Sequence, residues 1–536
     1  MRCIAVWMTL LPVVAWGGLC HCADAQVAKG PDKKTKPKFT IAKDTTYLTE
    51  PLDKDGYPDF LKAINDRLRQ GVTPDNNANV LLWKASGPHP EGATMPAGFF
   101  KLLGIATPPD KGDYFVRLLK YLSSIDPKMK PDEKYWAMLD RIGERPWKAK
   151  DFPQVAKWLK ANDKPLAHVV EASKRTHHYL PLLPTETADK QPTGLVGVLL
   201  PSVQCNREFA TTLVIRAMMH LGEGRVEEAW QDLLACHRLG RLVARGGCLI
   251  EHLVGVAIDN LASQADLTFL DSAKLDAKQA MKCLQDLQKL PPKTRLSDFV
   301  DTYERFMFLD AILLVDRRGT QCIAEFAGVN RDLFAQALDP KANPVLYDID
   351  WDPALRSANR FYDRCAAAMR VQDRPTREKQ LAEIANDLAK IKSDLFDLGG
   401  ISALVDAKKP GERGKLLGDL MLALWGLPGL PTGKLQQTAD RDEQKARNLH
   451  LAFGLAAYRS DIGKYPAKLD NLAPKYLPKI PDDLFTGKPL IYCPAADGYL
   501  LYSFGVNGID DQGRNDEDNP PGDDLRVRMP LPPTKN

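Results

Sequence analysis

The chain has 536 residues, and its 73 Lys and Arg against 69 Asp and Glu give a formal net charge of +4. A charge so close to zero argues against a dedicated nucleic-acid-binding protein, which carries a concentrated basic face. Hydrophobic residues make up 44% and charged residues 26% of the chain, which are ordinary values for globular proteins and exclude global disorder. The length predicts about two to four domains.

The first 25 residues have the pattern of an export signal. Arg2 supplies a positive start, the segment from Ile4 to Trp16 is apolar, and Ala23-Asp24-Ala25 forms a small-x-small cleavage site before Gln26. The apolar run is shorter than the roughly 20 residues that a membrane-spanning helix needs. We therefore expect a cleaved signal peptide over 1–25 and a periplasmic or secreted protein without a transmembrane segment. A retained or lipid-modified anchor is the alternative.

Cleavage would leave an odd number of cysteines and no C-x-x-C pair, which argues against a zinc knuckle or a dense disulfide framework. We expect buried free thiols, with a bridge between Cys236 and Cys248 as the alternative. Residues 26–50 are predicted to form a linker, because five lysines alternate with Pro and Gly between Lys29 and Lys38. Such a segment has little apolar surface to bury and stays extended and solvated.

Residues 51–435 have apolar residues at helical spacing, which predicts one or more α-helical domains built from antiparallel hairpins. In the clearest hairpin, a helix beginning near Glu208 leads to a turn at Gly222-Glu223-Gly224, and a return helix ends near Gly246. Further helices are expected at 353–369, 377–396 and 416–425.

The hairpin resembles a tetratricopeptide hairpin, although no regular repeat accompanies it. The helical region also resembles that of uncharacterised exported proteins from planctomycete-type bacteria. This likeness runs through Tyr57-Pro58-Asp59, the segment from Gly71 to Asn77 and the segment from Gly222 to Asp259. It implies a helical fold and export, and it implies nothing about activity.

Most catalytic motifs are absent from the helical region, including G-x-S-x-G, H-E-x-x-H and the phosphate-binding glycine loop. Three histidines and one glutamate lie in consecutive predicted helices: His220, His237, Glu251 and His252. Three imidazoles with a carboxylate have the composition of a metal or acid–base site. The four side chains either converge on such a site or point into separate packing, and the sequence leaves both readings open.

Residues 436–536 predict a small α+β domain. An amphipathic helix is expected from Arg441 to Tyr458, because Leu449, Ala452 and Phe453 share one face. Three short strands are expected at 490–493, 499–504 and 525–529, the last with alternating apolar and basic residues. We therefore expect a long helix lying on a three-stranded antiparallel sheet.

The loop between the second and third predicted strands is strongly acidic. From Asp510 to Asp524 the chain has seven acidic residues and one arginine, so a folded loop would be strained without a cation. Asp, Asn and backbone oxygens are the ligands that Ca²⁺ prefers, and the glycines permit a tight backbone. A solvated acidic loop is the alternative.

The C-terminal region, about residues 440–529, resembles the periplasmic part of the major pseudopilin of type II secretion systems. The likeness runs through Gly463-Lys464-Tyr465-Pro466, Tyr476-Leu477-Pro478, Gly487-Lys488-Pro489 and Tyr502-Ser503-Phe504-Gly505. It implies a calcium site whose ligands would be Asn507, where the family has Asp, and the later pair Asp516 and Asp518, with Asp510 and Asp511 as additional ligands. Filament assembly is not implied, because the region lacks the processing site and hydrophobic helix of pseudopilins.

Two functions follow from the sequence. The first is a non-enzymatic exported scaffold that binds a protein partner through its helical region and is stabilised by calcium at its C-terminal module. The alternative is an exported hydrolase with a site formed by His220, His237, Glu251 and His252. No nucleic-acid partner is expected.

Overall fold

The computed structural model describes residues 38–92, 94–95, 98–183, 193–198, 200–323, 338–397, 401–425 and 433–533. The predicted signal peptide and the first part of the predicted linker, 26–37, lie outside these ranges. The described residues are mostly helical and carry a three-stranded antiparallel sheet near the C-terminus, which confirms the coarse fold class. Within these ranges, every helix is too short or too polar to cross a membrane.

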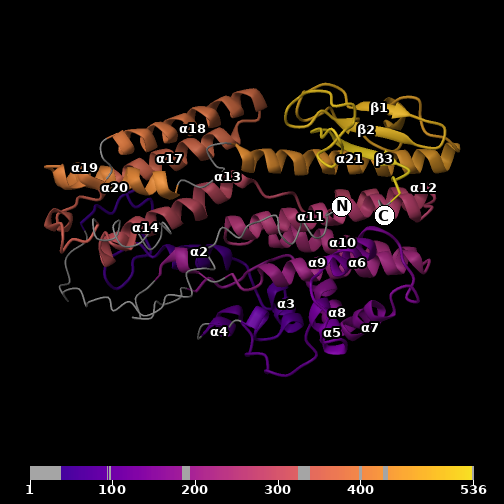
Figure 1. The fold of residues 1–536 in the computed structure, drawn as a ribbon, viewed down its shortest axis with the longest axis horizontal. Helices are drawn as coiled ribbons and strands as arrows, with labels where there is room; N and C mark the ends of the chain where they lie inside the picture. The colour runs from indigo at the N-terminus through magenta and orange to yellow at the C-terminus, as the bar shows by residue number, and fades with distance from the viewer. Residues whose placement is uncertain are drawn as a thin grey trace.

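The first half of the described chain is helical (Figure 1). They are α2 (Phe60–Leu68), α3 (Ala78–Ser86), α4 (Phe99–Leu103), α5 (Leu118–Ile125), α6 (Glu133–Glu144), α7 (Pro153–Ala161), α8 (Asp163–Ser173), α9 (Val203–Gly222), α10 (Val226–Val243), α11 (Leu249–Ser272) and α12 (Ala277–Gln288). Helices α9 and α10 form the predicted hairpin, and α11 packs against both. Helices α10 and α11 touch through their backbones, since a Cβ atom added at Gly255 would lie 2.2 Å from the Ala244 nitrogen.

The second half begins with further helices and ends in the sheet (Figure 1). The helices are α13 (Leu296–Phe299), a π-helical turn η4 (Val300–Glu304), α14 (Arg305–Arg318), α17 (Asp352–Arg370), α18 (Arg374–Asp397), α19 (Ile401–Asp406), α20 (Pro410–Trp425) and α21 (Lys434–Ile462). Short 3₁₀ turns complete the described helices: η2 (Pro90–Gly92), η3 (Leu195–Gly197), η5 (Pro344–Tyr347) and η6 (Leu469–Leu472).

The sheet has the strand order β1 (Ile491–Pro494), β2 (Tyr499–Ser503) and β3 (Leu525–Met529), with both pairs antiparallel. Leu501 in the central strand is paired with Tyr492 on one side and with Val527 on the other. The sheet lies on α21, as predicted, and the strands begin and end within one residue of the expected positions. Helix α21 is longer than predicted and begins seven residues before Arg441, at Lys434.

The buried apolar residues form two large clusters. The first unites α3, α5 to α12, α21 and the sheet, and the second unites α2, α13, α14, α17, α18 and α20. Helix α21 contacts the sheet on one side and α11 and α12 on the other, and the ring of Phe453 lies 5.7 Å from that of Trp230 in α10. The core therefore does not divide at the boundary that we expected between residues 435 and 436.

Residues 38–50 differ from the solvated linker that the sequence predicts. Thr45 and Thr46 are fully buried, and the backbone N–H of Thr40 donates a 2.7 Å hydrogen bond to Asp352 at the start of α17. Arg356 in α17 forms an ion pair with Asp44 at 2.7 Å. The lysine-rich pattern stops at Lys38, and the residues after it supply the apolar and hydroxyl groups that hold this segment against the second cluster.

Candidate functional site

The acidic loop between β2 and β3 folds back on itself and gathers several of the predicted metal ligands. Asp511 accepts hydrogen bonds from the backbone N–H of Asp523 at 2.8 Å and from the side-chain amide of Asn507 at 3.3 Å. The backbone N–H of Asn507 in turn donates to Asp523 at 2.8 Å. Asp510 accepts a hydrogen bond from the hydroxyl of Tyr502 at 3.1 Å. Asn507 and Asp511 therefore contact each other, whereas the Asp510 carboxylate is bonded to Tyr502.

Asp524 is the residue of this loop that sequence reasoning left out of the site. Its side chain is 1% exposed, and its Oδ2 atom accepts a 2.7 Å hydrogen bond from the N–H of Gly513, while its Oδ1 atom is buried without a hydrogen-bond partner. Burial, together with the nearby carboxylates of Asp511 and Asp510, raises the pKa of Asp524 to about 6. The alternation of β3 turns Leu525, Val527 and Met529 inward and would place residue 524 on the outer face, so the strand pattern carried no signal for the burial of Asp524.

The other two predicted ligands have different surroundings. Asp518 forms an ion pair with Arg526 in β3 and accepts a 2.9 Å hydrogen bond from the N–H of Asn515. Asp516 is exposed and makes no hydrogen bond or ion pair with the described residues. Arg441 in α21 forms a further ion pair, with Asp523. Two guanidinium groups from outside the loop thus reduce the repulsion between its carboxylates. The sequence did not reveal these partners, because their positions depend on tertiary contacts.

His220, His237, Glu251 and His252 each have separate partners, and the described structure does not bring them into one site. His220 accepts a 2.8 Å hydrogen bond from Arg225. Glu251 accepts one of 2.8 Å from the N–H of Gly247, and the ring of His252 lies 3.1 Å from the hydroxyl of Thr294. Among the described residues, no three His, Cys, Asp or Glu side chains are arranged to hold one metal ion, in the helical region or in the loop.

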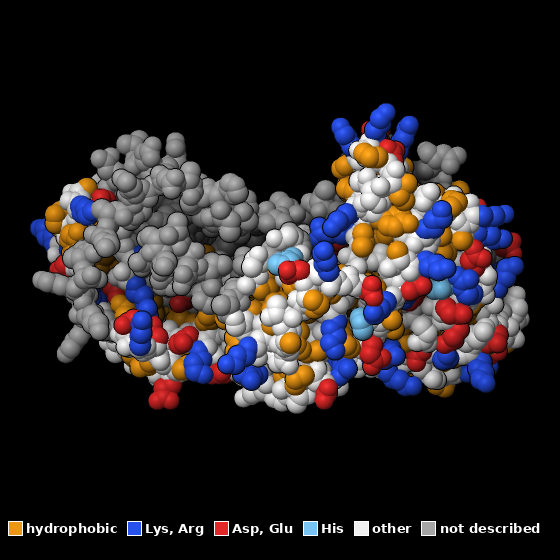
Figure 2. Space-filling model, turned by 90° about the horizontal axis from the view of Figure 1, so that it is seen from below, with side chains coloured by type: hydrophobic (Ala, Val, Ile, Leu, Met, Phe, Trp, Pro, Cys, Tyr) orange, Lys and Arg blue, Asp and Glu red, His pale blue; other side chains and the backbone are white. Residues whose placement is uncertain are grey.

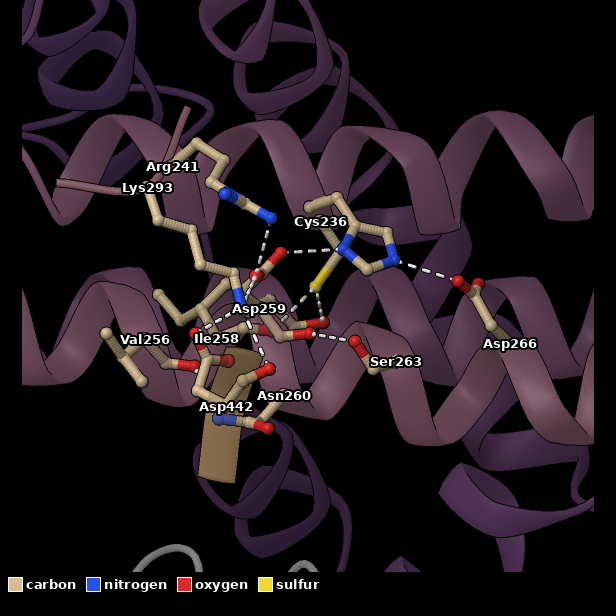
Figure 3. A network of polar contacts seen from close by, with 12 residues as sticks. Cys236, Arg241, Val256, Ile258, Asp259, Asn260, Ser263, Asp266, Lys293 and Asp442 are labelled. Carbon is tan, nitrogen blue, oxygen red and sulfur yellow. Dashed lines mark hydrogen bonds and ion pairs between the residues drawn. The ribbon is translucent and has the colours of Figure 1, made fainter. Parts of the chain in front are cut away.

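His237 belongs instead to a buried polar network that joins α10, α11 and α21 (Figure 3). Its ring lies between Asp259, at 2.7 Å from Nδ1, and Asp266, at 2.9 Å from Nε2. Burial lowers the pKa of His237, but the two carboxylates outweigh it and raise the pKa to about 9. The imidazolium is therefore the stable form in the core, and the ring acts as a structural cation.

The same network continues to the C-terminal region. Asp259 also pairs with Arg241 at 3.1 Å and lies 3.9 Å from the Lys293 ammonium group, which forms a second ion pair with Asp442 in α21 (Figure 3). Burial acts to raise the pKa of Asp259, but the His237 hydrogen bond and the neighbouring cations lower it overall. Because each charge has an opposite partner, the network holds α21 in register on the helical region.

A second group of buried titratable residues surrounds the π-helical turn. Burial raises the pKa of Glu304 to about 8 and that of Glu251 to about 7. One carboxyl oxygen of each residue has no hydrogen-bond partner. Burial also raises the pKa of Cys248, which lies 3.7 Å from a Glu251 oxygen. The Cys248 thiol is therefore neutral at pH 7, whereas Glu251, with its pKa of about 7, is part ionised there. None of the described cysteines is in a disulfide, so the alternative bridge between Cys236 and Cys248 is absent.

Comparison with protein-family models, with curated proteins and with solved structures found no match for this chain. The resemblances to pseudopilins and to exported planctomycete proteins therefore rest on the sequence motifs alone.

Proposed function

We propose that the chain is an exported, non-enzymatic scaffold that binds a protein partner through its helical region, and that calcium stabilises its pseudopilin-like C-terminal region. The buried, unpartnered Oδ1 atom of Asp524 beside Asp510 and Asp511 carries the calcium proposal. A buried carboxylate oxygen without a donor is costly unless a cation satisfies it. Carboxylate and amide oxygens fit Ca²⁺, which takes about six to eight oxygen ligands.

The non-enzymatic role is supported by the pairing of the core histidines. His237 is locked between two carboxylates, and His220 and His252 have separate partners. A general base must reach its substrate, and these three side chains are committed to contacts within the helix packing instead. The hydrolase alternative would therefore need residues other than the four that the sequence suggested.

Calcium binding is tested by melting the full mature chain with calcium and with a chelator. A ligand that binds only the folded state stabilises it by about 2.7 kcal/mol when it is present at about a hundredfold excess over its Kd. We expect calcium to raise the melting temperature and Mg²⁺ to have little effect, because Mg²⁺ prefers a small octahedral shell. The calcium response should weaken below about pH 6, where Asp524 becomes protonated.

Two double variants locate the site within the loop. If Asn507, Asp510 and Asp511 bind the ion with Asp524, replacing Asp510→Asn and Asp511→Asn abolishes the calcium response. If the full predicted set binds it, Asp518 must leave Arg526, and the pair Asp516→Asn with Asp518→Asn abolishes the response as well. An unmodified chain whose melting curve ignores the chelator would refute the calcium proposal.

A further inference from the structure

An open surface cavity of about 530 Å³, most of whose lining residues are exposed, lies between α3, α8 and the loop that connects α4 to α5. Its volume falls within the range of about 300–1,000 Å³ that is usual for small-ligand sites. Helices α3 and α8 pack side by side and supply two of its walls, and the loop residues 105–114 supply the third.

The loop wall is mainly apolar, and its aromatic residue is anchored by two contacts. Ile105, Pro108, Pro109 and Tyr114 line it, and the Tyr114 hydroxyl donates a 2.6 Å hydrogen bond to the carbonyl of Pro109. The Tyr114 ring packs directly on Gly87, where φ is +81° and an added Cβ would lie 2.8 Å from the ring. Glycine at position 87 allows both the positive φ and the close approach of the Tyr114 ring, and this packing preorganises an aromatic surface.

The helix walls carry an excess of positive charge. Lys164 and His168 lie one turn apart on α8, and Lys84 lies in the last turn of α3. Lys164 is paired with Asp113 at 2.7 Å, whereas Lys84 makes no hydrogen bond or ion pair with the described residues. Burial lowers the pKa of His168, and the charges of Lys84 and Lys164 lower it further, so both ammonium groups act on this ring.

This excess is local to the cavity. Figure 2 views the molecule from below, the side on which α3 and α8 lie in Figure 1, and shows basic, acidic and apolar side chains mixed over the described surface. A general attraction for polyanions is not expected from such a surface, whereas a single unpaired ammonium group beside an apolar wall suits a small amphipathic anion.

We propose that this cavity binds a small organic anion with one carboxylate and a flat apolar body. The carboxylate pairs with Lys84 and the polar edge of His168, and the body packs against Tyr114 and the prolines of the loop. Lys164 is already paired with Asp113, and the ligand's carboxylate would be the corresponding partner of Lys84. This activity is independent of the calcium loop, which belongs to the C-terminal region.

The test uses the full mature chain and the fluorescent probe naphthalene-2-carboxylate, with binding followed by fluorescence anisotropy. We expect saturable binding with a Kd below about 1 mM. Lys84→Gln should weaken binding by about fivefold or more, since it removes a charge-assisted contact in a partly exposed site. Thr107→Trp should abolish it by filling the cavity, because Thr107 lines the wall and is itself exposed.

Two controls make the result specific. Lys157→Gln removes an exposed lysine of α7 that does not line the cavity, and it should leave binding unchanged. The neutral analogue naphthalene-2-methanol should bind more weakly and should not respond to Lys84→Gln. The proposal is overturned if the carboxylate does not bind saturably, or if Lys84→Gln and Lys157→Gln weaken binding equally.

Discussion

Glu304 shows how strongly the surroundings of one residue can change its chemistry. It ends the π-helical turn, its side chain is 3% exposed, and its Oε2 atom has no hydrogen-bond partner. Burial raises the pKa from 4.5 to about 8, so the folded state holds a proton that the unfolded chain releases at neutral pH. The contribution of Glu304 to the free energy of unfolding is therefore fully present below about pH 4.5, and it is lost as the pH rises from there through about 8.

Replacing Glu304→Gln should remove this loss, because the amide has a similar shape and does not titrate. At pH 8 we expect the variant to have a free energy of unfolding higher than that of the unmodified chain by on the order of 3 kcal/mol, and therefore a higher melting temperature. At pH 5 the two proteins should differ little. Melting curves across this pH range measure the effect. The control Glu383→Gln changes an exposed residue of α18 and should follow the unmodified chain at every pH. A Glu304→Gln curve parallel to the unmodified one would show that Glu304 does not titrate in this range.

At the scale of single elements, helix α21 marks the limit of what the sequence could predict. The spacing of Leu449, Ala452 and Phe453 predicted a helix, and the alternation of β3 predicted a half-buried strand, because both patterns depend on local geometry. The first turns of α21 carry the buried acids Asp440 and Asp442 instead of an apolar stripe. Their partners are Arg377 and Lys293, which are distant in sequence, so no local pattern could reveal this part of the helix.

The ion pair between Lys293 and Asp442 should contribute to the docking of α21. Asp442→Ala removes the carboxylate partner of the partly buried Lys293, which keeps its 2.9 Å hydrogen bond to the backbone carbonyl of residue 442 and the 3.9 Å contact to Asp259, and we expect a loss of about 2 kcal/mol in stability. Adding Lys293→Met removes the unpaired charge, so the double variant should lose less than the sum of the two single variants. Denaturant unfolding of all four proteins completes this cycle, and strictly additive losses would mean that the two side chains do not interact.

At the scale of the whole molecule, the segments that share one apolar cluster are not consecutive in sequence. The first cluster contains α3 to α12 apart from α4, and it is completed by α21 and the sheet, which follow the entire second cluster in sequence. Composition and periodicity predicted a helical part followed by a small α+β part. They could not predict that α12 packs mainly against α21, because this contact joins segments about 150 residues apart in sequence.

The cysteine thiols, which form no disulfide within the described residues, allow this arrangement to be tested in the intact chain. Cys236 and Cys283 are buried in the first cluster, Cys322 and Cys365 in the second, and Cys493 is exposed on β1. Phe453→Ala in α21 removes a fully buried ring that contacts Trp230, which should destabilise the first cluster by about 3–5 kcal/mol. Labelling of Cys236 and Cys283 by a thiol reagent should then be faster by about a hundredfold or more, because it depends on local opening.

Cys322 and Cys365, two cysteines of the second cluster, discriminate between the possible folding units. Although Cys322 and Cys365 are nearer to residue 453 in sequence, their labelling should change little in Phe453→Ala. Leu355→Ala, which removes a fully buried side chain of the second cluster, should produce the opposite pattern. Mass spectrometry of the labelled peptides, with Cys493 as the rapidly labelled standard, measures all five sites. If residues 436–536 form an independent unit, Phe453→Ala will leave Cys236 and Cys283 as protected as before, since the helical region would keep its core without α21.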